Sequence, residues 1–163
     1  MMFPRLFGNF FQHGYVTNDM VRAKALFASQ FGVSQYIDID NALDVLTPEG
    51  PRTLDLKISL AYVDNLQVEL IEPRGGSAAD LYRKVLPANE FAVVIHHMAY
   101  LIPGPEEAWH EFRRHIGNDT YPIAIEAEVG PVKFAYIDTR KSTGHYSEYL
   151  WMSEDINAMV PRN

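Results

Sequence analysis

The fold is decided by one apolar stretch, Phe91-Ala92-Val93-Val94-Ile95-His96-His97-Met98-Ala99-Tyr100-Leu101. Its length and its β-branched and aromatic residues are typical of a buried strand. Two adjacent histidines interrupt the apolar run. Because neighbouring side chains of a strand point to opposite faces, we expect His96 and His97 to face different sides of the sheet.

A second stretch near the start of the chain has the same character. Phe11-Gln12-His13-Gly14-Tyr15-Val16-Thr17-Asn18 also places a histidine early in a strand-like run. Gly32 follows His13 by 19 positions, and Gly117 follows His97 by 20. Each interval contains a strand end, a turn signal and a helical pattern. This weak self-similarity indicates a duplicated supersecondary unit.

The order of the remaining patterns predicts an α+β fold. Apolar residues recur at helical spacing over residues 20–31 and 106–115, and short alternating runs that are typical of strands follow each helix. Residues 41–52, which contain three proline or glycine residues, are predicted to form a loop. The expected architecture is two β-α-β-β-β modules that form a curled sheet of mixed and antiparallel strands around a cavity, with the helices outside. The predicted divisions are an N-terminal arm (1–10), a first module (11–73), a linker (74–90), a second module (91–151) and a C-terminal tail (152–163).

Composition narrows the classes of function. The 163 residues are 47% hydrophobic and 21% charged, as expected for one globular domain or two small modules that share a core. A net charge of −7 without a basic tract argues against nucleic acid or an anionic membrane as partner. The absence of cysteine excludes disulfides and thiolate metal sites. No apolar run is long enough to span a bilayer, and the first ten residues lack the features of a signal peptide, so we expect a cytoplasmic protein.

Four ionisable residues lie inside strand-like apolar runs: His13, Glu69, His97 (or His96) and Glu148. A single histidine in a strand is more often a satisfied core or edge residue than a ligand, and a single glutamate can face solvent. Here, however, each module supplies one histidine from its first strand and one glutamate from its last. Buried carboxylates are costly unless they are paired or bind a metal. Two imidazoles and two carboxylates that converge would form a site for a divalent ion.

Four segments together resemble the vicinal oxygen chelate superfamily, which includes glyoxalase I, methylmalonyl-CoA epimerase, extradiol dioxygenases and the bleomycin-resistance proteins. The resemblance covers residues 11–151, and the first module is nearest in look to methylmalonyl-CoA epimerase. The segments are His13-Gly14-Tyr15-Val16-Thr17-Asn18-Asp19, Gln67-Val68-Glu69-Leu70-Ile71-Glu72-Pro73, Ile95-His96-His97-Met98-Ala99-Tyr100 and Gly144-His145-Tyr146-Ser147-Glu148-Tyr149.

The resemblance implies one divalent metal ion (zinc, nickel, cobalt, manganese or iron) held by His13, Glu69, His97 and Glu148. It favours the second histidine of the pair, and strand alternation would then turn His96 away from the metal. A weakly held ligand can release the metal and accept a proton, so Glu148 is the expected catalytic base.

A fourth ligand favours a metal-dependent isomerase, epimerase or lyase that stabilises an enolate of a small oxo-acid or acyl thioester. An epimerase needs a second acid or base, for which Asp44, Glu49 and Glu72 are candidates. The alternatives are an iron-dependent ring-cleaving dioxygenase, which would use two histidines and one carboxylate, and a metal-free protein that binds a small hydrophobic ligand. We expect a small-molecule substrate and a homodimer.

Overall fold

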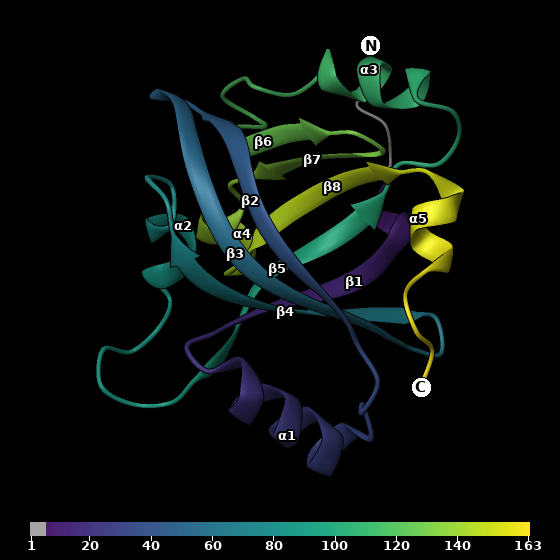
Figure 1. Ribbon diagram of the computed structural model, residues 1–163. Helices are drawn as coiled ribbons and strands as arrows, with labels where there is room; N and C mark the ends of the chain where they lie inside the picture. Colours follow the sequence, from purple (N-terminus) through teal and green to yellow (C-terminus); the bar gives the residue numbers. More distant parts are fainter. Residues whose placement is uncertain (1–5) are drawn as a thin grey trace.

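The computed structural model describes residues 6–163, and Figure 1 shows its strands curled into a barrel with helices outside. The predicted arm of residues 1–10 lies partly outside the described residues, and so does the expectation of no signal peptide that rests on it. The strands are β1 (Phe10–Thr17), β2 (Ile37–Thr47), β3 (Gly50–Val63), β4 (Leu66–Gly75), β5 (Val93–Leu101), β6 (Ile123–Val129), β7 (Val132–Ile137) and β8 (Tyr146–Met152). The helices are the 3₁₀ turn η1 (Phe7–Asn9), α1 (Met20–Phe31), α2 (Asp80–Arg83), α3 (Glu107–Arg113), α4 (Arg140–Thr143) and α5 (Glu154–Ala158).

Around the barrel the strands follow the order β1-β4-β3-β2-β6-β7-β8-β5. In each half the first and last strands are parallel neighbours, since β1 pairs with β4 and β5 pairs with β8. The halves meet on one side along β1 and β5, which share seven antiparallel residue pairs. On the other side β2 and β6 share a single pair, Leu46 with Glu126. This is the predicted α+β architecture of two β-α-β-β-β units in a curled sheet.

Helix α1 has the limits that the sequence predicts. The carboxylate of Asp19 accepts a hydrogen bond from the backbone N–H of Arg22, which satisfies one of the free donors at the helix start. At the other end Gly32 adopts a left-handed conformation, with φ of 72°, that ends the helix.

The outer cluster under α1 determines which face of β4 points inward. Phe27 of the helix belongs to the same buried cluster as Val68 and Leu70 of β4. Because these two residues face the helix, the alternate residues Gln67 and Glu69 face the barrel interior.

The predicted loop over residues 41–52 is wrong. β2 continues to Thr47 and β3 begins at Gly50, so a two-residue turn joins two long strands. Leu43 and Val45 of β2 are buried and alternate with exposed residues, as in a half-buried strand. The proline and glycine signals therefore mark only a tight hairpin.

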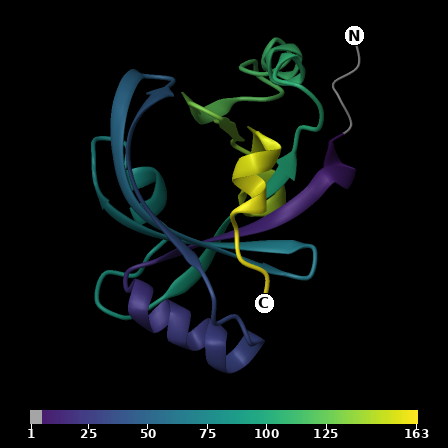
Figure 2. The same cartoon turned by 45° about the vertical axis from the view of Figure 1, so that its right-hand side comes forward.

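The C-terminal segment lies across one end of the barrel. Figure 2 shows α5 in front of the barrel interior, between β1 and the β6–β7 hairpin. Hydrogen bonds tie this segment down, because the Asn163 side chain accepts from the backbone N–H groups of Ser34 and Gln35, and Tyr62 donates its hydroxyl to Asn157. Across residues 6–163, none of the helices has the length and apolar character needed to cross a membrane.

Candidate metal centre

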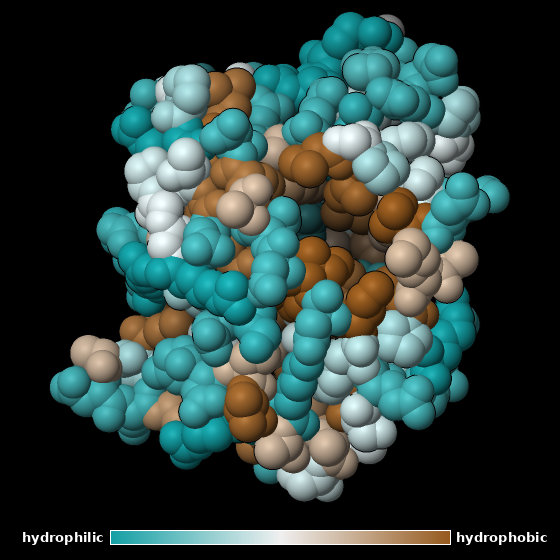
Figure 3. Space-filling view, in the orientation of Figure 1, coloured by the Kyte–Doolittle hydropathy of each residue, from teal (hydrophilic) through white to brown (hydrophobic). Residues whose placement is uncertain are grey.

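A cavity of about 320 Å³ occupies the barrel interior, and Figure 3 shows a hollow ringed by hydrophobic residues on this face of the molecule. Its wall consists mainly of aliphatic side chains from β2, β3, β7 and β8, such as Leu43, Ile58 and Leu150. No lysine or arginine is among the residues of the described chain that line it. The polar residues that line it are Gln12, Asn41, Gln67, Glu69, Tyr82, Tyr136 and Glu148.

Three oxygen atoms converge on one nitrogen beside this cavity. His97 Nε2 lies 3.1 Å from Gln12 Oε1, 3.1 Å from Glu69 Oε2 and 3.1 Å from Glu148 Oε2. His97 is fully buried, and the side chains of Glu69 and Glu148 are 13% and 6% exposed. Four strands supply the four donors, and these strands are neighbours in the barrel in the order β4, β1, β5 and β8.

Glycine makes room for the imidazole. Gly14 pairs with His97 across the β1–β5 ladder, and a Cβ at this position would lie 1.9 Å from a ring atom of His97. The ring therefore lies directly over the backbone of β1, in space that only glycine leaves open. A side chain at this position would displace the nitrogen from the three oxygens.

Burial and charge shift the pKa values of His97 and Glu148 when no metal is bound. Burial alone would lower the pKa of His97, but the negative charge of Glu148, aided by that of Glu69, outweighs burial and raises the pKa to about 9. Burial raises the pKa of Glu148, and the positive charge of His97 opposes that effect. At neutral pH the metal-free cluster therefore keeps a proton on or beside His97.

The donor set fits a divalent cation. The potential ligand atoms of Glu69, His97 and Glu148 all lie within 4.8 Å of one another. The single Nε2–H of His97 is aligned with Gln12, and Glu148 Oε2 is buried without a hydrogen-bond partner. A buried carboxylate oxygen without a donor is costly, and a bound cation would satisfy it. One nitrogen and three oxygen donors suit a hard to borderline metal ion.

The structure brings together three of the four predicted ligands. Glu69, His97 and Glu148 meet at the cluster, whereas His13 does not reach it. The first and last strands are neighbours in both modules, so the expected convergence holds for the residues of β4, β5 and β8. The exception is the ligand expected from β1.

His13 lies on the outer face of β1. Its ring contacts those of Phe10 and Tyr15, with centroid distances of 5.2 and 6.1 Å. Tyr15 in turn packs against Phe27 of α1, which covers the outside of the barrel. Burial, together with the positive charge of His145, lowers the pKa of His13.

Gln12 occupies the inward position that was predicted for His13. Its amide donates from Nε2 to Gln67 Oε1 at 2.7 Å, which leaves Oε1 directed at His97. Strand alternation places Gln12 and Gly14 on one face and His13 on the other. The signal in the sequence was Gly14, because a glycine two positions from a polar residue marks the face that another group approaches closely.

His96 is not among the converging donors, but it does not face the outside of the sheet as strand alternation predicts. Gly14 pairs with His97 and Tyr15 pairs with Ile95, so β5 carries one extra residue at His96. This β-bulge suspends the alternation of side chains. Both histidines are buried, and His96 packs against Tyr82 and Tyr136, which line the interior cavity. The two histidine rings meet edge to face at 5.4 Å, and both pack against Tyr136.

The three candidates for a second acid or base do not reach the cluster. Glu72 accepts a hydrogen bond from the backbone N–H of Met20 at 2.6 Å, and so serves the start of α1. Glu49 accepts from Thr47 at the β2–β3 turn. Asp44 is exposed and lines a hollow outside the barrel.

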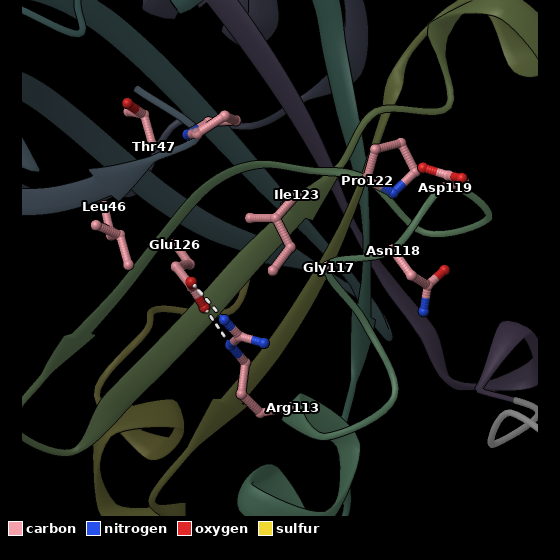
Figure 4. A pocket seen from close by; sticks show the side chains of 10 residues that line it. Leu46, Thr47, Arg113, Gly117, Asn118, Asp119, Pro122, Ile123 and Glu126 are labelled. Carbon is pink, nitrogen blue, oxygen red and sulfur yellow. Dashed lines mark hydrogen bonds and ion pairs between the residues drawn. The ribbon is translucent and has the colours of Figure 1, made fainter. Parts of the chain in front are cut away.

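A second hollow, of about 400 Å³, lies outside the barrel where β6 meets the segment after α3 (Figure 4). Its cationic residue is already paired, since Arg113 donates from Nη2 to Glu126 Oε1 at 2.8 Å and from Nε to the other carboxylate oxygen. No histidine lines this hollow among the described residues. The interior cavity is therefore the stronger candidate for a functional site.

Solved structures with this fold are known. No family model matches the sequence, and no curated protein does. A methylmalonyl-CoA epimerase from Mycobacterium tuberculosis is similar with a TM-score of 0.58 and 12% identity, over 97% of each chain. A hypothetical protein from Bacillus halodurans has a TM-score of 0.53 and 16% identity, over 89% of this chain and 94% of its own. A Streptomyces coelicolor methylmalonyl-CoA epimerase in complex with 2-nitronate-propionyl-CoA has a TM-score of 0.51 and 11% identity, over 87% of this chain and 95% of its own. With its two β-α-β-β-β units curled into one barrel, the chain shares the fold of these methylmalonyl-CoA epimerases.

Proposed function

We propose that this protein is a divalent-metal-dependent isomerase or epimerase that moves a proton at a carbon next to a carbonyl group. One observation carries the proposal. Gln12, Glu69 and Glu148 each direct an oxygen to within 3.1 Å of His97 Nε2, beside an apolar cavity. Such a cluster is costly to bury unless its charges are paired or bind a cation, and its nitrogen and oxygen donors suit a divalent metal ion.

The metal would be held by Gln12, Glu69, His97 and Glu148, so Gln12 replaces His13 in the expected set. Zinc, nickel, cobalt, manganese and iron all accept such ligands. When bound, the ion supplies a Lewis acid that stabilises negative charge on a carbonyl oxygen. The protein contributes a fixed geometry, since Gly14 seats the His97 ring and Gln67 holds the Gln12 amide.

Proton transfer is assigned to the two carboxylates. Glu148 is the first base, and its burial raises its pKa, which strengthens it as a proton acceptor. Glu69 comes from β4 and Glu148 from β8, which lie on opposite sides of the β1–β5 pair. Two carboxylates on two sides of one point allow a proton to be removed from one face of a carbon and returned to the other. Glu69 is therefore our candidate for the second acid or base.

The cavity sets the kind of substrate. Its wall is aliphatic, and no lysine or arginine of the described chain lines it, so it suits an uncharged hydrophobic group next to the reacting carbonyl. A volume of about 320 Å³ accommodates a small oxo compound or the acyl part of a thioester. The epimerase of similar fold that is bound to 2-nitronate-propionyl-CoA supports including acyl thioesters among the compounds to test.

A metal-free protein that binds a hydrophobic ligand is the second candidate, favoured by the aliphatic wall. An iron-dependent ring-cleaving dioxygenase is less well supported, because the described cluster has one histidine with two carboxylates rather than two histidines with one. Elemental analysis of the purified protein separates the metal-free candidate from the other two.

Neighbouring residues offer a matched pair of variants for the metal site. Gln12→Ala removes an oxygen from the cluster, whereas His13→Ala changes the outer face of the same strand. We expect the wild type and His13→Ala to bind one equivalent of Co²⁺ or Zn²⁺, and Gln12→Ala to bind it roughly 10- to 100-fold more weakly. Equal affinity in both variants, or loss in His13→Ala alone, would contradict the ligand set.

The reaction class is tested by solvent exchange. The metal-loaded protein is incubated in D₂O with small 2-oxo compounds and acyl thioesters, and loss of the proton next to the carbonyl is followed by NMR. We expect exchange with at least one compound, and no exchange with Glu148→Gln. Exchange that persists in Glu148→Gln would exclude Glu148 as the base.

The expected homodimer and cytoplasmic location stay predictions. Analytical ultracentrifugation of the purified protein tests the first, and fractionation of the producing cells tests the second.

A further inference from the structure

We propose that His96 is a positioning residue that holds the His97 ring with Nε2 directed at the three oxygens. This inference rests on the proposed role of His97 as a metal ligand. It starts from the β-bulge, which places a second imidazole directly behind the first. His96 Nδ1 lies 3.1 Å from His97 Nδ1, and the two ring planes are 89° apart.

A backbone carbonyl fixes which nitrogen of His96 carries hydrogen. His96 Nε2 lies 3.1 Å from the carbonyl oxygen of Leu81, at the short helix α2. A carbonyl oxygen can only accept a hydrogen bond, so Nε2 of His96 must be the protonated nitrogen. In the neutral imidazole the other nitrogen, Nδ1, is then bare and can only accept.

A hydrogen also lies between the rings of His96 and His97, and only one of the two can carry it. One hydrogen must lie between the two Nδ1 atoms for them to approach within 3.1 Å. If His96 carried it, His96 would be a cation with both nitrogens protonated, 2% exposed and not in contact with a carboxylate. The hydrogen therefore belongs to His97 Nδ1, which donates to His96.

This arrangement leaves His97 Nε2 as the coordinating atom. A neutral His97 that carries hydrogen on Nδ1 has its lone pair on Nε2, which faces Gln12, Glu69 and Glu148. Groups that hydrogen-bond the second nitrogen of a ligating histidine fix its tautomer and its ring orientation. Here the imidazole of His96 takes this role, and the backbone carbonyl of Leu81 sets the tautomer of His96.

His96 is itself held firmly. Its ring stacks on that of Tyr82, with centroids 4.7 Å apart and planes 19° from parallel. Tyr136 and Tyr146 pack against it at 5.7 and 5.0 Å. A side chain packed on several sides by aromatic rings can orient its neighbour without a loss of rotamer freedom at the moment of binding.

Two substitutions separate positioning from packing. His96→Phe keeps the aromatic stack on Tyr82 and removes the acceptor, whereas His96→Gln loses the stack and can restore an acceptor for His97 Nδ1–H. His13→Phe changes a histidine on the outer face and serves as the control. Affinity for Co²⁺ and Zn²⁺ is measured by competition with a chelator. The tautomer of His97 is followed by long-range ¹H–¹⁵N NMR in the Zn²⁺-loaded protein, and in the metal-free protein at a pH above the raised pKa of His97, about 9, where the ring is neutral.

We expect His96→Phe to bind both ions roughly 10- to 100-fold more weakly than the wild type, and to lose the single Nδ1–H tautomer of His97. His96→Gln should recover most of the affinity, and His13→Phe should match the wild type. If the wild type binds metal and His96→Phe binds it equally well with an unchanged His97 tautomer, the positioning role is overturned and the proposed function stands. If the wild type binds neither ion, the proposed metal centre fails, and this inference fails with it. If His96→Phe does not fold, His96→Gln is the deciding variant. His97→Ala, which lacks the ligand itself, gives the lower limit of Zn²⁺ affinity. A His96→Gln protein that binds Zn²⁺ as weakly as His97→Ala would refute positioning through a hydrogen bond.

Discussion

Gly14→Ala is the most direct test of how the proposed metal centre is built. The substitution adds a single methyl group on the inner face of β1, where the ring of His97 lies over the glycine. The new Cβ would lie 1.9, 2.1 and 2.4 Å from three ring atoms of His97. Gly14 does not adopt a positive φ, so the change alters space rather than backbone strain.

The size of the effect follows from these distances. Van der Waals contact for such a carbon begins near 3.4 Å, so the imidazole has to retreat by about 1.5 Å. Metal–ligand distances tolerate errors of only about 0.2 Å, so a ring displaced this far no longer coordinates together with Glu69 and Glu148. We expect Zn²⁺ affinity to fall by at least roughly 100-fold, the upper end of what loss of a supporting contact costs. Crowding the interior should also lower the free energy of unfolding by about 1–3 kcal/mol.

Chelator competition measures the Zn²⁺ affinity, and urea unfolding of the metal-free protein measures stability. Gly8→Ala is the matched control, because a Cβ at Gly8 would have no atom within 4 Å. A folded Gly14→Ala protein that binds Zn²⁺ as tightly as the wild type would refute the placement of His97 over β1. Weak binding in Gly8→Ala as well would show that the loss is not specific to the site.

The remaining predictions concern protons and packing. Metal binding near pH 7.5 should release about one proton, because the pKa of His97 is raised to about 9 in the metal-free cluster. Calorimetry in two buffers of different ionisation enthalpy measures the number of protons released. Release of no proton would contradict a protonated His97 in the metal-free protein. Burial, followed by the positive charge of His97, lowers the pKa of His96 to about 3, so below about pH 6.5 the unfolded chain binds a proton that the folded protein excludes. The stability that the neutral ring confers is complete above that pH and is lost as the pH falls toward 3, so urea unfolding should show a smaller acid loss in His96→Phe than in the wild type. Leu56→Ala in the cavity wall should lower the free energy of unfolding by about 2 kcal/mol, because the side chain is buried but borders the open cavity. A much larger loss in urea unfolding would mean that the wall is packed more tightly than the cavity implies.

Much of the fold was accessible from the sequence, because local signals and the global arrangement agree. The helix over residues 20–31 begins after Asp19 and ends at Gly32, as capping chemistry predicts. The repeat of a histidine strand and a glutamate strand correctly indicated that Glu69, His97 and Glu148 would meet. Periodicity and the cost of burying charge indicated the two glutamates and one histidine of the pair, and the family resemblance favoured His97 over His96.

Both errors at the site concern the face of the sheet to which a side chain points. β1 and β5 each carry one extra residue relative to the other, Phe11 in β1 and His96 in β5. A displacement of one residue moves a side chain to the opposite face of a sheet, and a bulge suspends alternation locally. Periodicity separates Gln12 from His13 but does not show which face of β1 points inward, and it could not show that His96 stays beside His97. The missed β2–β3 hairpin differs in kind, because proline and glycine at a tight turn conceal the alternation on either side.

The unequal joints between the two halves of the barrel have a mechanical consequence. Seven residue pairs join β1 to β5, whereas one pair, Leu46 with Glu126, joins β2 to β6. The barrel is therefore held firmly along β1 and β5, called the spine here, and only loosely along β2 and β6, called the edge strands. All four donors lie on or next to the spine, while the wall residue Leu43 belongs to an edge strand. We therefore expect the cavity to widen or narrow at the β2–β6 joint when ligands of different size bind, while the proposed metal ligands beside β1 and β5 keep their positions.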